Sequence, residues 1–337
     1  MNVSNTSSVA ASDAPLVSVV MLAYNQRELV GEAMASLLAQ DYPNYELIVS
    51  DDNSTDGTFD EMGRIVAGHD GRPTVSINQT TANRGTLSHL YEAVALSRGR
   101  FIVVAGGDDI SLPHRVSTLV AAWRATGAQA MFSGCTVVDA ERRPILDGTV
   151  WLDEATQSFF PRRLAYKISG AMAAYDRNVF EELTLPAEPI YSEDVFFSLM
   201  IHYNNGLIAT VPDRLVLYRN HENSFSNSHG SRISVANAEV KAQRLIRDQW
   251  AILCRFRLMV EEARHQGRTD DVDLAAVRRM EDFYDYAAHW IELPISLRLR
   301  RLGLIRSRHH LRWALLRLFG LPWFVRFKGF QRSFRSA

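Results

Sequence analysis

Apolar residues follow two alternating spacings along the first third of the chain. Residues 17–22 and 46–50 are short runs rich in apolar, β-branched residues, and each precedes apolar residues at the spacing of one helix face. Residues 74–77 and 101–105 repeat the strand pattern, with a helical pattern at 87–95 between them. This alternation predicts parallel strands joined by right-handed crossovers, with helices on both faces of one sheet.

The pattern becomes less regular after residue 130 and helical after residue 231. In the irregular part we expect a helix near 193–202 and short strands at 130–132, 207–211 and 214–218. The candidate helices of the last part are 235–266, 271–291 and 296–318.

A chain of 337 residues with 47% hydrophobic residues is long and apolar enough for one large or two ordinary domains. Its two cysteines, Cys135 and Cys254, lack the spacing of a metal site, so we expect reduced, packed thiols and a cytoplasmic location. The predicted organisation is a flexible leader at 1–14, an α/β domain at 15–231 and a helical region at 232–337.

Charge is distributed unevenly, although the formal net charge is only −1. No Asp or Glu follows Glu292, and residues 293–337 carry eleven of the 37 basic residues, interleaved with apolar ones. No apolar run there reaches the ~18 residues that a membrane span needs, so we expect this segment to lie on an anionic membrane surface. The alternative is an ordinary helical subdomain or a dimer interface. Nucleic acid is not expected as a partner, because no binding motif accompanies the charge.

Two pairs of carboxylates stand where strands of the predicted sheet end. Asp51–Asp52 follows the run at 46–50, and Asp108–Asp109 follows the run at 101–105 and two glycines that permit close approach of a ligand. Because ligands bind beyond the carboxyl ends of parallel strands, both pairs are expected at one polar edge of the sheet. Carboxylates there suit Mg²⁺ or Mn²⁺ beside a diphosphate. The structural alternative for Asp108–Asp109 is to cap the helix that Pro113 begins.

Three further segments carry candidate chemistry. The loop at 51–57 is rich in acceptors and donors; it either reads a nucleoside or forms an Asx-rich turn that caps the next helix. Glu193–Asp194 opens a predicted helix, where it either supplies a general base or interacts with the helix dipole. His221 follows a predicted strand and is either a ligand or a structural residue.

In their order along the chain, these segments resemble the family 2 glycosyltransferases of the GT-A type, over roughly residues 16–225. The segments that carry the resemblance are VSVVMLAYN (17–25), ELIVSDDNSTDGT (46–58), NRG (83–85), VVAGGDD (103–109), SED (192–194) and YRNH (218–221). Two positions depart from the pattern: Ala23 stands where the family often has Pro, and Gly106 where many members have a further Asp. No QxxRW-type motif follows the SED segment, which argues against a processive polysaccharide synthase.

The resemblance implies a nucleoside pocket at the end of the first strand. Leu22, Tyr24 and Asp52 would line this pocket, with Asn83 and Arg84 near the base.

The resemblance also implies the parts of a transfer site. Asp108 would contact the ribose or the sugar, Asp109 would hold the divalent ion against the diphosphate, and His221 would complete or support that site. Asp194 would be the catalytic base, and Glu193 would contact acceptor or sugar hydroxyls.

We therefore predict a metal-dependent, inverting glycosyltransferase with a GT-A domain and a mainly α-helical C-terminal region. It would move one sugar from a nucleotide-sugar donor to a hydroxyl of a glycan or lipid-linked acceptor, in bacterial surface polysaccharide or lipopolysaccharide synthesis. The expected location is the inner face of the cell membrane, and an oligomer could form through the C-terminal helices. One alternative is a sugar-phosphate nucleotidyltransferase. Such an enzyme would need a glycine-rich, basic phosphate-binding loop after the first strand, where this chain has AYNQRE. Another is a non-catalytic membrane-associated binding protein.

Overall fold

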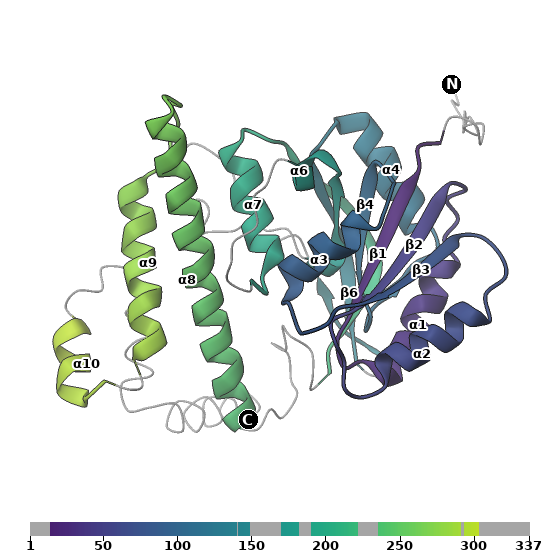
Figure 1. Ribbon diagram of the computed structural model, residues 1–337, viewed down its shortest axis with the longest axis horizontal. Coiled ribbons are helices and arrows are strands. Elements are labelled where there is room, and N and C mark those ends of the chain that lie inside the picture. Colours follow the sequence, from purple (N-terminus) through teal and green to yellow (C-terminus); the bar gives the residue numbers. More distant parts are fainter. Residues whose placement is uncertain are drawn as a thin grey trace. The chain divides into compact units, whose positions relative to one another are not determined.

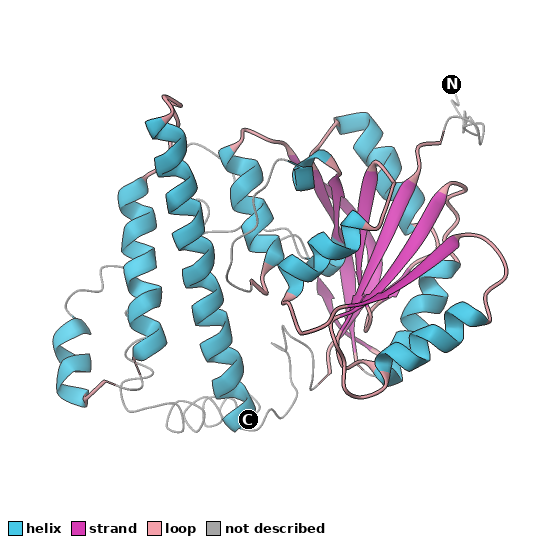
Figure 2. Cartoon of the chain, in the orientation of Figure 1, coloured by secondary structure: helices cyan, strands magenta, loops and turns pink. Residues whose placement is uncertain are grey.

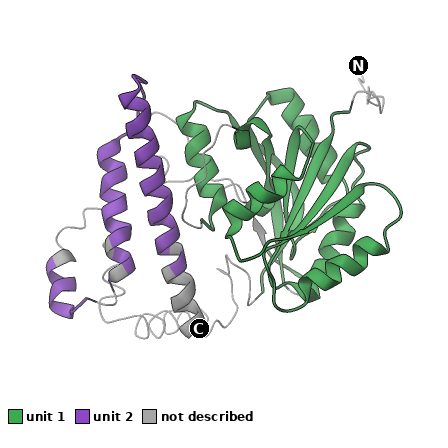
Figure 3. Ribbon diagram, in the orientation of Figure 1, with its two compact units in different colours: residues 1–157, 162–221 green, residues 158–161, 222–337 purple. Residues whose placement is uncertain are grey.

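The computed structural model describes residues 14–139, 141–148, 170–181, 190–221, 235–290 and 293–302. The chain separates into two compact units, residues 1–157 with 162–221 and residues 158–161 with 222–337 (Figure 3). The first unit combines a sheet with helices, and the described part of the second is helical (Figure 2). The predicted leader, except Ala14, and the predicted boundary at residue 231 lie outside the described residues.

The amino-terminal half of the first unit alternates strands and helices as the sequence predicts. Its elements are β1 (Val17–Ala23), α1 (Arg27–Leu38), β2 (Tyr45–Asp51), α2 (Thr58–Ala67), β3 (Thr74–Gln79), α3 (Thr86–Ala95) and β4 (Phe101–Gly106). The four strands are parallel and lie in the order β3-β2-β1-β4 (Figure 1). The central strand β1 is almost entirely buried because helices cover both faces of the sheet, which explains its nearly continuous apolar sequence.

The second half of the unit extends this sheet with strands of mixed direction. Its elements are β5 (Ile110–Ser111), α4 (Arg115–Thr126), β6 (Ala130–Val138), β7 (Pro144–Gly148), η1 (Gly170–Met172), β8 (Ala173–Asp176), α6 (Asn178–Glu181), α7 (Glu193–Tyr203) and β9 (Ile208–Arg219). The sheet continues β4-β8-β6-β9-β5, with β7 paired to β6, and β8 runs antiparallel to both neighbours.

The two strands predicted at 207–211 and 214–218 are wrong as separate elements. They form the single strand β9, which runs through Pro212. Proline lacks a backbone N–H and disturbs the hydrogen bonding between strands, so from the sequence Pro212 predicts a break between two strands. In the structure, the pairing of β9 with β6 shifts register around Gly134, and this irregularity accommodates the proline.

The two faces of the sheet bury different kinds of side chain. On one face, residues of α1, α2 and α4 pack on Val19, Met21 and Leu47 in one apolar core. On the other face, aromatic rings of α3, β8, α6 and α7 form a cluster in which the Tyr175 and Phe197 centroids are 4.7 Å apart. This second cluster fixes α7, and with it the start of that helix, relative to the sheet.

The second unit consists, in its described part, of α8 (Val235–His265), α9 (Leu274–His289) and α10 (Ile295–Leu302). Helices α8 and α9 pack together, and the Arg257 guanidinium of α8 is 2.6 Å from a carboxylate oxygen of Glu281 on α9. Both cysteines of the chain are free thiols. Within the described ranges, no helix has the length and apolar character needed to cross a bilayer.

Candidate active site at the carboxyl edge of the sheet

The carboxylate loops after β2 and β4 leave the sheet on either side of β1. In the parallel register Ala23 lies opposite Asp51, and Leu22 lies opposite Gly106. The Asp52 backbone N–H donates to the Ala23 carbonyl at 2.9 Å, and the Gly107 N–H donates to the Leu22 carbonyl at 2.8 Å. The two loops therefore start from adjacent positions at one edge, as the strand pattern predicts.

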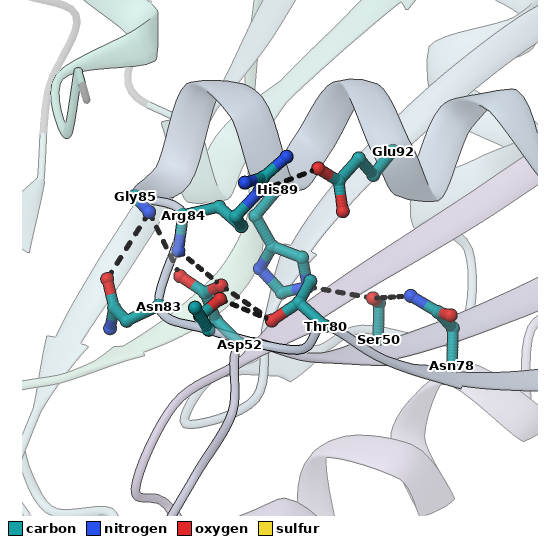
Figure 4. Close-up of polar contacts among 10 residues, drawn as sticks. Ser50, Asp52, Asn78, Thr80, Asn83, Arg84, Gly85, His89 and Glu92 are labelled. Carbon is teal, nitrogen blue, oxygen red and sulfur yellow. Dashed lines mark hydrogen bonds and ion pairs between the residues drawn. The ribbon is translucent and has the colours of Figure 1, made fainter. Parts of the chain in front are cut away.

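The carboxylate of Asp52 is used to hold a neighbouring loop (Figure 4). Its Oδ1 accepts hydrogen bonds from Thr80 Oγ (3.0 Å) and the Arg84 backbone N–H (2.8 Å), and its Oδ2 accepts from the Gly85 N–H at 3.1 Å. Only 4% of the residue is exposed. Asp52 thus orders the loop before α3, and both of its oxygens are engaged by the chain itself.

A buried polar layer lies beneath this loop. The His89 Nε2 atom of α3 is 2.7 Å from Ser50 Oγ, which also accepts from Asn78 Nδ2 at 3.0 Å (Figure 4). Burial lowers the pKa of His89, against the opposing charges of Asp52 and Asp51. A neutral imidazole therefore packs between α3 and the end of β2.

Asn83 and Arg84 lie in the loop that Asp52 holds. The Asn83 Oδ1 atom accepts from the Gly85 N–H at 3.3 Å. The Arg84 side chain is 52% exposed and donates to Glu92 Oε1 at 2.9 Å, so the guanidinium runs along α3 (Figure 4). The predicted base-side residues are therefore adjacent to Asp52.

The other two carboxylates of the 51–57 loop bond within the loop and to the starts of two helices. Asp51 accepts from the Ser54 N–H at 2.8 Å, while Asp56 accepts from the N–H groups of Arg27 (3.1 Å) and Thr58 (3.0 Å). Arg27 and Thr58 begin α1 and α2, whose first N–H groups have no partner within the helix. The capping turn describes Asp56, while Asp51 closes the turn itself through Ser54.

Asp108 and Asp109 occupy different environments. Asp109 is 5% exposed; its Oδ1 accepts from the Arg219 backbone N–H at 2.9 Å, and its buried Oδ2 has no hydrogen-bond partner among the described residues. Burial, helped by the charge of Asp108, raises the pKa of Asp109 well above its ordinary value. The Asp108 side chain is less buried, and its Oδ2 lies 3.0 Å from His221 Nε2. His221, predicted to complete or support the metal site, thus contacts the neighbouring carboxylate of the pair.

Gly106 makes room for both carboxylates. A Cβ atom at this position would lie 2.7 Å from Asp108 Oδ1 and 3.1 Å from Asp109 Oδ2. A side chain at position 106 would therefore require the Asp108 carboxylate, and to a smaller extent that of Asp109, to shift.

The carboxylate pair fits a divalent cation that also binds other oxygens. Asp109 presents a carboxylate oxygen without a partner in the described part of the chain, and Asp108 adds a second hard ligand beside it. Across the described residues, no group of three or more His, Cys, Asp or Glu side chains is arranged to hold a metal. An ion at this pair would therefore take its remaining ligands from water or from a diphosphate.

Glu193 and Asp194 form the first turn of α7. Glu193 is 7% exposed, and its carboxylate lies where a side chain on Gly170 would be, so that a Cβ at 170 would overlap Oε1. Asp194 is half-buried. The two carboxylates thus differ in access, and Asp194 is the more open of the pair.

Backbone contacts connect α7 to the same edge of the sheet. The Leu87 N–H at the start of α3 donates to the Ile190 carbonyl just before α7, at 2.9 Å. Gly170 belongs to η1, which precedes β8 and therefore lies beside the carboxyl end of antiparallel β4. The structure brings the Asp52 loop, the Asp108–Asp109 pair and the start of α7 to one edge.

A comparison with protein families classifies the chain that carries this site. The family model described as glycosyl transferase family 2 matches residues 18–184. The chain belongs to that family. The matched segment includes both carboxylate loops and Gly170, whereas Glu193, Asp194 and His221 follow its end.

Several relatives share parts of this family 2 chain. EpsE of Bacillus subtilis is 36% identical over 107 residues, which are 32% of this chain and 38% of EpsE. The succinoglycan biosynthesis protein ExoO of Rhizobium meliloti is 31% identical over 136 residues, 40% of this chain and 38% of ExoO. The Escherichia coli UDP-Glc:alpha-D-GlcNAc-diphosphoundecaprenol beta-1,3-glucosyltransferase WfgD is 23% identical over 194 residues, 58% of this chain and 72% of WfgD. The chain therefore spans less than two fifths of the first two relatives.

Solved structures confirm the predicted GT-A fold with a helical C-terminal region. Residues 1–349 of S. aureus TarS, in complex with UDP-GlcNAc, superpose with a TM-score of 0.54 at 17% identity, covering 90% of this chain and 80% of that fragment. The mannosyltransferase PcManGT from Pyrobaculum calidifontis, in complex with GDP-Man and Mn²⁺, gives 0.52 at 18% identity, covering 94% and 86%. At these identities the likeness concerns the fold alone.

Sequence reasoning missed several residues of this family 2 site. Arg115 and Arg219 are each 1% exposed, and their positive charges favour the ionised form of Asp109; burial lowers the pKa of Arg115 to about 10. His89 and Gly170 were likewise not singled out. The only sequence signal for His89 is its place between two buried leucines at helical spacing, and none distinguishes Gly170 from other glycines.

Proposed function

We propose that the chain is an inverting glycosyltransferase that moves one sugar from a nucleotide-diphosphate sugar to an acceptor hydroxyl. The observation that carries the proposal is the shared edge at which Asp194 and the Asp108–Asp109 pair stand. Membership of family 2 supports the transfer reaction, and fold neighbours in complex with UDP-GlcNAc and with GDP-Man and Mn²⁺ support this class of donor.

The nucleoside would bind at the end of β1. Tyr24 is 44% exposed there and offers a ring face, and Leu22 lies directly before the turn. Asn83 and the exposed guanidinium of Arg84 would approach the base, while Asp52 keeps their loop in place through its hydrogen bonds. The role of Asp52 is thus to shape the pocket.

The diphosphate would lie against Asp108 and Asp109. When bound there, Mg²⁺ or Mn²⁺ neutralises the charge that develops on the departing diphosphate. Asp109 would contact the ion through its unpartnered oxygen. His221 orients Asp108 across their 3.0 Å contact, which leaves Asp108 positioned toward the ribose or sugar.

Asp194 would act as the general base on the acceptor side. As the bond forms between the acceptor oxygen and sugar C1, the hydroxyl proton moves to the Asp194 carboxylate and the nucleoside diphosphate leaves from the opposite face. One displacement of this kind inverts the anomeric configuration. Glu193, which is held more rigidly by burial, would contact acceptor or sugar hydroxyls.

A donor panel tests the proposal. UDP-, GDP- and dTDP-sugars are each added with Mn²⁺ or with chelator, and thermal stabilisation and release of nucleoside diphosphate are measured. We expect one nucleotide class to stabilise the protein and to be hydrolysed slowly with Mn²⁺. If no donor stabilises the protein or is turned over under either condition, the protein is not a sugar transferase of this kind. That result would favour the alternative of a non-catalytic binding protein.

The proposal extends to the acceptor and to the location of the protein. The name of WfgD includes a diphosphoundecaprenol acceptor, which supports a lipid-linked or glycan acceptor in bacterial surface polysaccharide synthesis for this chain too. We propose a peripheral position on the inner face of the cell membrane, through residues 293–337. Of these, the structure describes α10, where Ile295, Leu297 and Leu299 are 38–53% exposed beside arginines.

Vesicle flotation measures the contribution of α10 in the full chain. Replacing Leu297 and Leu299 with Glu should reduce recovery with anionic vesicles at least about fivefold, because apolar contact is lost and like charge repels the surface. Ser296→Glu, which adds charge at a polar exposed position of the same helix, should have a smaller effect. Equal flotation of both variants and wild type would remove α10 from the membrane contact.

Gly170→Ala should impair transfer by displacing Glu193. The added methyl group overlaps the Glu193 carboxylate, so either this side chain or η1 must move. We expect kcat to fall at least about tenfold, since small misplacements at a reacting centre have large effects on rate. Gly63→Ala is the matched control, because a Cβ atom at 63 meets no atom within 4 Å. A Gly170→Ala enzyme with wild-type kcat would show that Glu193 is not needed in this position.

A further inference from the structure

The side chain of Arg115 joins two strands of the sheet and the turn η1. Arg115 is the first residue of α4, yet only 1% of it is exposed. Its Nη1 donates to Ser111 Oγ on β5 at 2.9 Å. Its Nη2 donates to the Val104 carbonyl of β4 at 2.7 Å and to the Ala171 carbonyl of η1 at 2.9 Å.

The Arg115 guanidinium forms hydrogen bonds at the point where the backbone pairing between β4 and β8 ends. Strands β4 and β8 pair from Phe101 to Val103, and Val103 lies opposite Ala174. Beyond this point the chain that leads into β8 forms the turn η1 and no longer supplies strand pairing to β4. Nη2 of Arg115 donates to a carbonyl on each side of that gap, and so links η1 to the carboxyl end of β4.

Local preferences do not explain an arginine in this position. The N-terminus of a helix carries a partial positive charge, which disfavours a cation in the first turn. Burial further disfavours the charged guanidinium. Arginine also differs from lysine here, because its planar fork reaches acceptors in several directions at once. The hydrogen bonds that Arg115 donates to three separate elements explain why an arginine is buried at this position.

The turn η1, to which Arg115 donates, also provides the space that the Glu193 carboxylate occupies. Gly170 precedes Ala171 in η1, and the Glu193 carboxylate occupies the space beside Gly170. Asp194 follows Glu193 on α7. On the donor side Arg115 acts only through its charge, which favours the ionised form of Asp109. The direct contacts of the carboxylate pair are instead with the Arg219 N–H, from which Asp109 accepts, and with His221, which contacts Asp108.

We propose that Arg115 is a positioning residue for transfer, which holds η1 against β4 and thereby places Glu193 and Asp194 opposite the carboxylate pair. The proposal rests on the proposed glycosyltransferase function. It assigns Arg115 to the acceptor side of the reaction, so its loss should lower the rate of transfer much more than the affinity for nucleotide.

Arg177 provides a matched control at the other end of the same strand pair. Its Nε donates to the Gly99 carbonyl at 2.6 Å, and its Nη2 donates to Ser97 Oγ at 2.6 Å. Arg177 thus closes the β4–β8 junction at the amino end of β4, away from the carboxylate edge. A purely structural role would make the two arginines equivalent.

The experiment compares Arg115→Met and Arg177→Met with wild type, using the donor that the panel selects. Unfolding temperature, the Kd for nucleoside diphosphate with Mn²⁺, and kcat for transfer are measured for each. For Arg115→Met we expect kcat to fall about 100-fold with a Kd within about threefold of wild type. Arg115→Lys keeps the charge and one or two of the bonds, so it should restore part of kcat. Arg177→Met should lose stability while kcat stays within about twofold.

Two results would overturn the proposal. One is an equal loss of kcat in the Met variants of Arg115 and Arg177, and the other is a loss of nucleotide affinity in Arg115→Met as large as the loss of kcat. If Arg115→Met does not fold, the Lys variants of both arginines make the same comparison. A wild-type chain that transfers no sugar from any donor would overturn the proposed function itself, whereas an active wild type with equivalent arginine variants would overturn only the role of Arg115.

Discussion

Asp194→Asn should reduce kcat for sugar transfer by about 10³-fold or more while the Kd for nucleoside diphosphate with Mn²⁺ stays within about twofold of wild type. The amide has nearly the shape of the carboxylate but cannot accept the acceptor proton, and general-base catalysis contributes on the order of 10²–10⁴-fold. Calorimetry with nucleotide and a transfer assay on the same preparation measure the two quantities.

Asp60→Asn is the control for this variant. Asp60 stands in the first turn of α2, as Asp194 does in α7, so both substitutions remove a carboxylate from a helix N-terminus. Asp60 is exposed and its loss should leave kcat unchanged. Full turnover by Asp194→Asn would exclude Asp194 as the base and leave Glu193 as the next candidate.

Asp109→Asn should weaken Mn²⁺-dependent nucleotide binding at least about tenfold and, in chelator, raise the unfolding temperature by a few degrees. The substitution removes a carboxylate that is buried with one unpartnered oxygen in the described part of the chain, while an amide oxygen can still accept from the Arg219 N–H. Loss of the charge removes a metal ligand and also relieves its desolvation. Unchanged nucleotide affinity with Mn²⁺ would contradict the assignment of Asp109.

The same residue predicts how stability depends on pH. The pKa of Asp109 is raised in the folded chain, mainly by burial, above the ~3.9 of an unfolded Asp. Between these two values the folded chain holds one more proton than the unfolded chain, so the free energy of unfolding in chelator falls as pH rises through this range. Mn²⁺ affinity should change in the opposite direction, because the ion binds the carboxylate. In Asp109→Asn both dependences should become flatter.

The two predictions assign different roles to Asp194 and Asp109, and local sequence reveals these roles only in part. Asp109 and Asp194 were identified as candidates because they follow a strand and open a helix, and the structure places both at one edge. His221 was identified as a candidate because it follows a strand, and its 3.0 Å contact with Asp108 connects it to the same carboxylate pair. The roles of all three in catalysis stay predictions until the variants are measured.

Sequence alone determined the succession of β1 to β4 and the helices between them. Strands buried on both faces need continuous apolar runs, and amphipathic helices need the 3.6-residue spacing, so both are written into short stretches of chain. The carboxyl ends of parallel strands meet at one edge, and this rule predicted where Asp52 and Asp109 would lie.

Only the tertiary structure decided the mixed half of the sheet and the state of individual side chains. Strand β8 is four residues long and contains two alanines, so its antiparallel place between β4 and β6 depends on partners distant in sequence. Asp52 accepts from N–H groups more than thirty positions away, and Arg115 is buried where helix-start preferences disfavour a cation. The physical reason is the same in each case: the hydrogen-bond partners and the burial that set these roles come from segments that spacing within a single stretch cannot specify.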